Sequence, residues 1–195
     1  MTPGKDIFDY FGKKKMRPYL LLIGLLLSSI TAQAQFNKAE YGPVIENSGP
    51  TFAIDAPDFP LNPDQEFKLV FDIHNSPEDP SRVNPMIETL ARFLNMHAKA
   101  GVPMANLKVV GVIHNRASKD AMNNEYYKEE FGVDNPNIAL MEALEKAGAK
   151  IYMCGQSIHA RKVNPERLAA SVKTALSAMT VFVTLQGQGY QLIRF

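Results

Sequence analysis

From residue 67 onward, short apolar runs alternate with amphipathic segments. Three of these runs are rich in β-branched and aromatic residues and have the length of buried strands; they cover 67–74, 107–114 and 150–154. Residues 85–99 and 137–147 carry apolar side chains at helical spacing, and each segment is followed by a glycine. Residues 118–131 are partly helical and rich in charge. Strands that alternate with helices predict a parallel sheet covered on both faces.

The C-terminal stretch allows two interpretations. Residues 177–188 contain the β-branched run 180–184, which favours a strand, but the length of the segment and the glycines that follow allow a helix. Residues 172–176 and 190–194 are typical of strands. A helix between these two strands keeps the alternation, and we therefore expect one.

The N-terminal pattern is of another kind. Residues 20–30 are almost entirely apolar, four basic residues precede them, and Ala32-Gln33-Ala34 follows. These three parts define a secretory signal peptide at residues 1–34, which we expect to be cleaved after Ala34. The apolar run is shorter than the ~20 residues of a membrane span, which argues against an uncleaved anchor. Met16 also suits the start of the signal peptide, and the mature protein is expected in the periplasm or outside the cell.

Residues 35–66 contain five prolines, which forbid a helix and favour extended structure. We interpret this segment as an arm that lies on the domain or on a neighbouring subunit. A disordered linker is the alternative, but the apolar residues of the segment argue against it. The short apolar pieces 44–45 and 52–54 could add an edge hairpin.

Net charge, length and missing motifs exclude several classes of function. Residues 1–34 hold five basic and two acidic residues, so their removal changes the formal net charge from +1 to −2. A near-neutral protein lacks the electrostatic footprint of nucleic-acid binding. The roughly 160 remaining residues suffice for one domain, so 67–195 is expected to fold as a single unit. No glycine-rich nucleotide motif, P-loop or nucleophile elbow is present, and no cofactor is expected.

The first three predicted strands end in polar residues. In an open parallel sheet, ligands bind beyond the carboxyl ends of the strands, so we expect these residues to share one rim. They are His74 and Asn75, His114 and Asn115, and Cys154 with Gly155 and Gln156. A histidine at a strand end can also simply bond a loop. His97 lies within a predicted helix, where we expect it to pack or cap.

The chain has one cysteine, so Cys154 cannot form an intramolecular disulfide. An intermolecular bridge, a buried inert thiol and a reactive thiol all remain open. The glycine after Cys154 and the basic residues His159, Arg161 and Lys162 favour a reactive thiol, because nearby cations lower a thiol pKa. A transition-metal site formed by His74, His114 and Cys154 is a weaker alternative, since no typical ligand spacing supports it.

Four segments carry a resemblance to the DsrE/DsrF-like sulfur-relay family over residues 67–195. They are FKLVFDIH, LKVVGVIHNRA, AGAKIYMCGQSI and LQGQGYQLIRF. The resemblance implies a three-layer α/β/α fold of the flavodoxin or Rossmann type, with a mostly parallel sheet of about five strands. It makes residues 177–186 the last helix. It also implies assembly as a small homo-oligomer.

In family members that act in sulfur relay, a cysteine at the end of this strand carries sulfane sulfur as a persulfide, and that role falls on Cys154. His114 or His159 would then stabilise an anion or move a proton, and Arg116 would add charge. The partners implied are a thiol-bearing protein or a small sulfur donor. The chain is at most a sulfurtransferase-like carrier; a non-enzymatic module that binds a metal or small ligand, or a structural oligomer, is the alternative. The export signal and the arm depart from the well-understood members.

Overall fold

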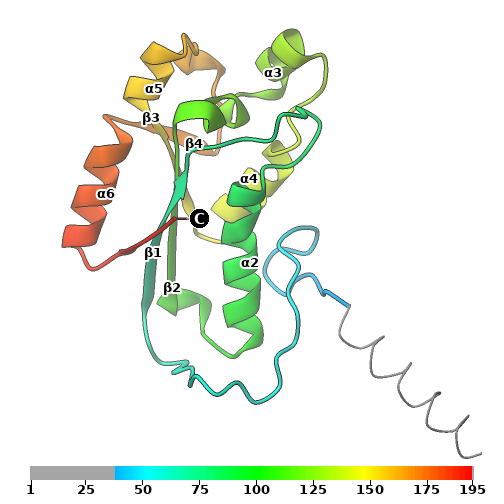
Figure 1. The fold of residues 1–195 in the computed structure, drawn as a ribbon, viewed down its shortest axis with the longest axis vertical. Coiled ribbons are helices and arrows are strands. Elements are labelled where there is room, and N and C mark those ends of the chain that lie inside the picture. Colours follow the sequence, from blue (N-terminus) through cyan, green and yellow to red (C-terminus); the bar gives the residue numbers. More distant parts are fainter. Residues whose placement is uncertain (1–37, 195) are drawn as a thin grey trace, which may run out of the picture. The chain divides into compact units, whose positions relative to one another are not determined.

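A computed structural model describes residues 38–194, so the predicted signal peptide lies outside the described residues. Five parallel strands form the sheet at the centre of the fold (Figure 1). They are β1 (Phe67–Ile73), β2 (Leu107–Ile113), β3 (Lys150–Cys154), β4 (Val172–Ala175) and β5 (Gln191–Ile193). Their spatial order is β4-β3-β2-β1-β5, so the chain lays down β1 to β4 in one direction and then crosses back to place β5 beside β1.

Helices cover both faces of this sheet (Figure 1). Helices α2 (Pro85–Lys99) and α4 (Ile138–Lys146) lie on one face, and α6 (Ala178–Gly187) lies on the other. The remaining helical segments are α3 (Asn124–Phe131), α5 (Gly155–Ala160) and the 3-10 turns η2 (Met104–Asn106), η3 (Asn115–Ala121) and η4 (Pro165–Arg167). This confirms the predicted three-layer α/β/α fold. Within residues 38–194, no helix combines the length and apolar character that crossing a bilayer requires.

Helix α6 resolves the ambiguous C-terminal stretch. The Ser177 side chain caps it by accepting the backbone N–H of Thr180 at 3.0 Å. The β-branched run 180–184 is nevertheless helical, because two parallel strands of one sheet can be joined only by a long crossover connection. Here the connection between β4 and β5 outweighs the local strand propensity.

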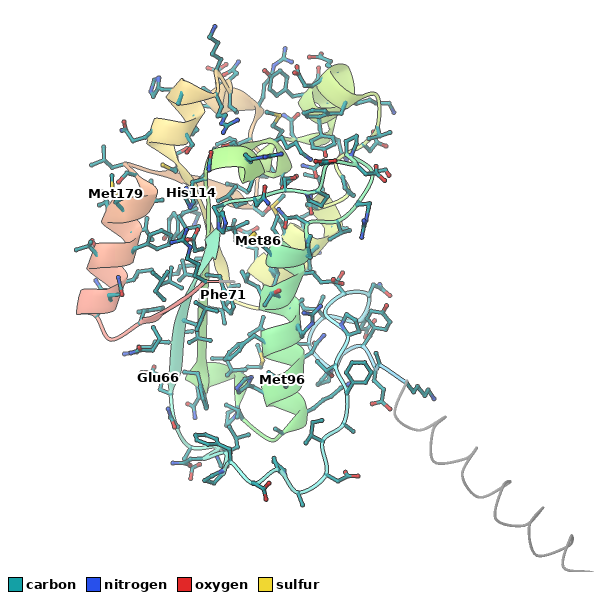
Figure 2. All side chains as sticks on the ribbon, in the orientation of Figure 1. Glu66, Phe71, Met86, Met96, His114 and Met179 are labelled. Atoms are coloured by element: carbon teal, nitrogen blue, oxygen red, sulfur yellow. The ribbon has the colours of Figure 1, made fainter. Side chains whose placement is uncertain are left out.

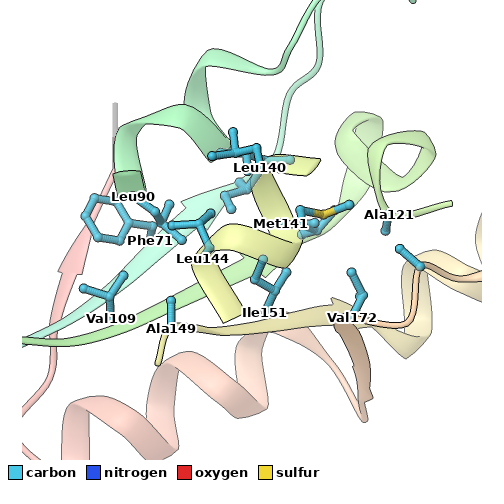
Figure 3. Close-up of a cluster of buried hydrophobic side chains, with 14 of the residues drawn as sticks. Phe71, Leu90, Val109, Ala121, Leu140, Met141, Leu144, Ala149, Ile151 and Val172 are labelled. Atoms are coloured by element: carbon cyan, nitrogen blue, oxygen red, sulfur yellow. The ribbon is translucent and has the colours of Figure 1, made fainter. Parts of the chain in front are cut away.

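The face covered by α2 and α4 holds the larger core. Alternate side chains of a strand point to opposite faces, so Leu69, Phe71 and Ile73 of β1 all enter this core. Figure 3 shows Phe71 among the buried side chains of this core. Gly111 of β2 gives Leu90 of α2 room to approach, since a Cβ at Gly111 would lie 2.9 Å from Leu90 Cδ2. Packing of this kind leaves no space for an added methyl group.

The face covered by α6 is thinner. Its buried hydrophobic cluster consists of Val70, Val110, Val112, Cys154 and Ala178. The outer side of α6 is apolar too: Met179 and Val183 expose 73% and 71% of their surface, and Figure 2 shows Met179 on the side of the helix away from the sheet. A single helix therefore separates this layer from solvent.

Residues 39–51 are fastened to α2 by one buried amide. Asn95 Oδ1 accepts the backbone N–H groups of Val44 and Ile45 at 3.1 and 2.8 Å, and Asn95 Nδ2 donates to the carbonyls of Ile45, Ser48 and Gly49. The segment thus lies on the domain. The suggested edge hairpin is wrong, because Glu40 and Thr51 form only an isolated antiparallel bridge and β4 and β5 are the edge strands.

Candidate functional site

Cys154, His114 and His74 end three neighbouring strands on the α6 side of the sheet. The register pairs Ile73 with Ile113 and Ile113 with Met153, so the next position along each strand brings the three residues into one row. Neighbouring strands lie about 4.8 Å apart. His114 extends from the end of β2 toward α6, where its ring centroid lies 6.2 Å from that of Phe182 (Figure 2). The rim predicted from the strand ends is therefore present.

The Cys154 thiol is surrounded by hydrogen-bond donors. Only 5% of the residue is exposed, and the donors that act on its sulfur are the N–H groups of Ser157, Ala178 and Gln156 and the Ser157 hydroxyl. Burial raises the pKa of the Cys154 thiol, but these donors outweigh that effect and hold the pKa below its ordinary value. The donors come from the first turns of α5 and α6, which place partial positive charge at the sulfur.

Asp72 binds His114 from the neighbouring strand. Its carboxylate oxygen Oδ1 lies 2.7 Å from His114 Nε2, and the aspartate is only 7% exposed. Asp72 points to the α6 face because it stands two positions after Val70, whose side chain lies in the α6 cluster. The carboxylate is thereby buried on the same face as Cys154.

Two further nitrogen-bearing side chains approach the same carboxylate. His74 Nδ1 lies 3.4 Å from Asp72 Oδ1, without hydrogen-bond geometry, and Arg194 Nε lies 3.4 Å from Asp72 Oδ2. Arg194 reaches this point because β5 pairs Ile193 with Phe71. One buried carboxylate thus gathers two imidazoles and a guanidinium at the end of the sheet.

Ser157 connects the Cys154 environment to the end of β2. Its hydroxyl accepts the backbone N–H of Asn115 at 3.1 Å, and the same hydroxyl is one of the groups that lower the pKa of the Cys154 thiol. Asn115 has a left-handed backbone, with a φ of 53°, and its side-chain oxygen accepts a hydrogen bond of 2.6 Å from Arg161. The turn after His114 is therefore fixed against α5.

The structure places the other predicted residues around this centre in different ways. Gly155 is required sterically, because a Cβ there would lie 2.7 Å from the Ala175 carbonyl oxygen. Gln156 contributes its N–H to the sulfur, while its side chain donates to the Leu176 carbonyl. His159, Arg116 and Asn75 are exposed.

None of these three exposed residues has a contact that links it to the thiol. The backbone of Arg116 donates to the His74 carbonyl and the carbonyl of Asn75 accepts from Asn84, while the His159 side chain forms no hydrogen bond with any residue that the structure describes. Residues 155–160 form helix α5. His97 packs as expected, with its ring centroid 3.9 Å from that of Phe93.

Sequence reasoning missed three residues of the site: Asp72, Ser157 and Arg194. A signal for Asp72 was available, because a charged residue two positions before a strand-end histidine lies on the same face as that histidine. Ser157 could have been found only by recognising α5, which sets its direction. Arg194 depends on the pairing of β5 with β1, for which no local pattern exists.

Metal binding finds no support in the part of the chain that the structure describes. Among residues 38–194, no group of three or more His, Cys, Asp or Glu side chains has an arrangement that could hold a metal ion. The alternative of a metal site formed by His74, His114 and Cys154 is therefore unsupported.

A sequence profile of the DsrE/DsrF-like family matches residues 68–195. The chain belongs to the DsrE/DsrF-like family. The matched segment contains β1 from its second residue, the other four strands and every site residue described above, and the family is associated with sulfur relay. The profile begins within β1, so the arm at 35–66 precedes the family segment. No curated protein matches the chain.

Two solved structures match the chain at low sequence identity. A protein of unknown function, MTH1491 from Methanobacterium thermoautotrophicum, matches with a TM-score of 0.50 and 18% identity, covering 67% of this chain and 100% of its own. The ychN protein from E. coli matches with a TM-score of 0.48 and 12% identity, covering 66% of this chain and 99% of its own. The first likeness supports the three-layer fold.

Proposed function

We propose that this protein accepts sulfane sulfur on Cys154 and passes it to an acceptor thiol. The observation that carries the proposal is the position of Cys154, which is buried at the end of β3 in one row with His114 and His74. Nearby backbone N–H groups and the Ser157 hydroxyl hold the pKa of its thiol below the ordinary value, which favours the thiolate. The thiolate is the nucleophile in sulfur exchange. Membership of a family associated with sulfur relay supports this use of the thiol.

The chemistry balances without an oxidant or reductant. The Cys154 thiolate attacks the outer sulfur of a persulfide R–S–S⁻, so that a bond forms between Sγ and that sulfur while the bond to R–S breaks. The products are Cys154–S–S⁻ and the thiolate R–S⁻, which takes up the proton released by Cys154. The same exchange with an acceptor thiol then returns Cys154 to its starting state.

Mass spectrometry after incubation with glutathione persulfide tests this function. Wild-type protein is expected to gain the mass of one sulfur atom, and a second thiol such as dithiothreitol is expected to remove it. Cys154→Ser is expected to gain nothing. Absence of the adduct on the wild type, or its persistence in Cys154→Ser, contradicts the proposal. The wild type treated with glutathione alone is the matched control.

We also propose that the protein acts after export. The support is the sequence of residues 1–34, with its basic cluster, apolar run and Ala32-Gln33-Ala34. Expression of the full chain in a bacterium and N-terminal sequencing of the periplasmic fraction test this directly. A mature protein that begins at Gln35 is expected, whereas an uncut chain in the cytoplasm contradicts export.

A further inference from the structure

His114 lies in the same row as Cys154, and its two ring nitrogens are not equivalent. A carboxylate oxygen only accepts, so the hydrogen between His114 Nε2 and Asp72 Oδ1, which lie 2.7 Å apart, belongs to the imidazole. A neutral His114 therefore keeps its free lone pair on Nδ1. The carboxylate that sets this arrangement is 93% buried, so water competes little for it.

We propose that Asp72 is the positioning residue of this site: it holds His114 in the tautomer that accepts a proton at Nδ1 and stabilises the imidazolium that results. This inference rests on the proposed sulfur transfer. His114 takes the proton of the Cys154 thiol before attack and gives it to the leaving thiolate R–S⁻ afterwards. The helix N–H groups and Ser157 hold the sulfur anion, and the pair of Asp72 and His114 handles the proton.

The groups around His114 favour it over the other predicted histidine. His159 is exposed and has no carboxylate partner among the described residues. Helix α6, which packs over His114, carries no titratable side chain. The titratable and charged groups near this pair are His74 and Arg194, which approach Asp72, and Cys154, Tyr152 and Tyr190, which belong to or pack against the hydrophobic cluster on the same face.

Arg194 and His74 help to hold the Asp72 carboxylate in place. Both lie 3.4 Å from the carboxylate, and Arg194 exposes 70% of its side chain, so it screens the charge from the solvent side. Because the carboxylate already has these partners when His114 is neutral, it is oriented before the proton arrives. Preorganised charge of this kind avoids a rearrangement cost during the reaction.

Single-turnover sulfur transfer from glutathione persulfide, followed by mass spectrometry between pH 5 and 9, tests the proposal. Asp72→Asn is expected to slow transfer by about 100-fold or more, the usual contribution of a positioned acid or base. Asp72→Glu is expected to recover part of the rate, and Asp134→Asn, which removes an exposed carboxylate, is the matched control. Alkylation of Cys154 by iodoacetamide needs the thiol proton removed but no proton delivered to its leaving group, so it is expected to slow by a smaller factor than transfer does.

Two comparisons separate a positioning role from a structural one. In a His114→Ala background, Asp72→Asn is expected to cause no further loss, because residues that act as a unit are not additive. An unchanged transfer rate in Asp72→Asn, a parallel loss of transfer and alkylation, or an additional loss in the double variant overturns the proposal. Failure of the proposed function itself has a different signature, since the wild type then forms no adduct at any pH.

Discussion

The two faces of the sheet are built differently, although the same strands supply both. Among residues 38–194, the buried cluster on the α2 and α4 side contains 26 hydrophobic residues, whereas the cluster on the α6 side contains five. Each face also has one buried carboxylate beside the carboxyl ends of the strands. Asp120 lies near the start of α2, bonded to Asn84 and Ser76, and Asp72 lies on the α6 side, bonded to His114.

This difference means that one face of the sheet mainly stabilises the fold, while the other face carries the candidate site. Successive side chains of a strand point to opposite faces, so Leu69, Phe71 and Ile73 lie in the larger core under α2 and α4, here called the thick side. Val70 and Asp72 lie under α6, here called the thin side. Substitutions on the thick side should therefore act on folding. Substitutions on the thin side should act mainly on the thiol.

The largest effect is expected from Leu90→Ala on the thick side. Leu90 is fully buried against Gly111, so its truncation leaves a cavity and is expected to lower the free energy of unfolding by about 2–5 kcal/mol. Val183→Ala on the outer side of α6 is the matched control, with an expected change within about 0.5 kcal/mol. Urea denaturation followed by circular dichroism measures both. Similar losses in the two variants would contradict the distinction between the faces.

Gly155→Ala should lower both the stability of the fold and the reactivity of Cys154. Its Cβ would meet the backbone oxygens of Ala175 and Leu176 at 2.7 and 3.1 Å, which are not free to move aside. Strain of this kind costs about 1–3 kcal/mol. Because Gly155 precedes the donors Gln156 and Ser157, iodoacetamide should also alkylate Cys154 more slowly at neutral pH. Alkylation at the wild-type rate would show that the position of α5 does not control the thiol.

Ser157→Ala tests the thin side alone. The variant removes one hydroxyl donor from the Cys154 sulfur and is expected to cost the thiolate about 1 kcal/mol, or roughly a fivefold loss of alkylation rate near neutral pH. Its stability should change little, since Ser157 is only partly buried. A profile of alkylation rate against pH should show the inflection moving to higher pH. An unmoved inflection would contradict the assignment of Ser157 as a donor.

The smallest effect concerns Asp120 and the pH dependence of stability. Burial raises the pKa of Asp120, and hydrogen bonds from Asn84 and Ser76 offset this only in part. The folded state therefore binds more protons than the unfolded state just above the ordinary aspartate pKa of about 3.9, and stability through this group falls as pH rises across that window. The difference in unfolding free energy between the wild type and Asp120→Asn isolates the effect. A difference that is constant from pH 4 to 7 would contradict it.

Periodicity alone located most of the fold. The predicted strands 67–74, 107–114 and 150–154 lie within one residue of β1, β2 and β3, and the helix predicted at 85–99 has the bounds of α2. These segments could be read because burial repeats at a fixed period within each of them. The β-branched run in α6 shows where this reasoning ends, since there the connection between distant strands decides the structure.

Only part of the site could be predicted from the sequence, because the rest depends on connections between distant strands. Cys154 and His114 stand at strand ends, which is a local feature. The Ala178 N–H that helps lower the pKa of the Cys154 thiol belongs to a helix later in the chain, and Arg194 follows the last strand. Such groups are brought together by the order of the strands, which no local pattern encodes.

The hydrogen bonds between Asn95 and the arm have a consequence for how the two are inherited. Asn95 lies inside the segment that defines the family, but the backbone groups it binds at residues 44–49 lie before that segment. A relative that lost the arm would keep a buried amide without partners, which is costly, and would gain by replacing it with an apolar residue. The arm and this asparagine should therefore be inherited together, so that one position within the family segment reveals whether an ancestor carried the arm.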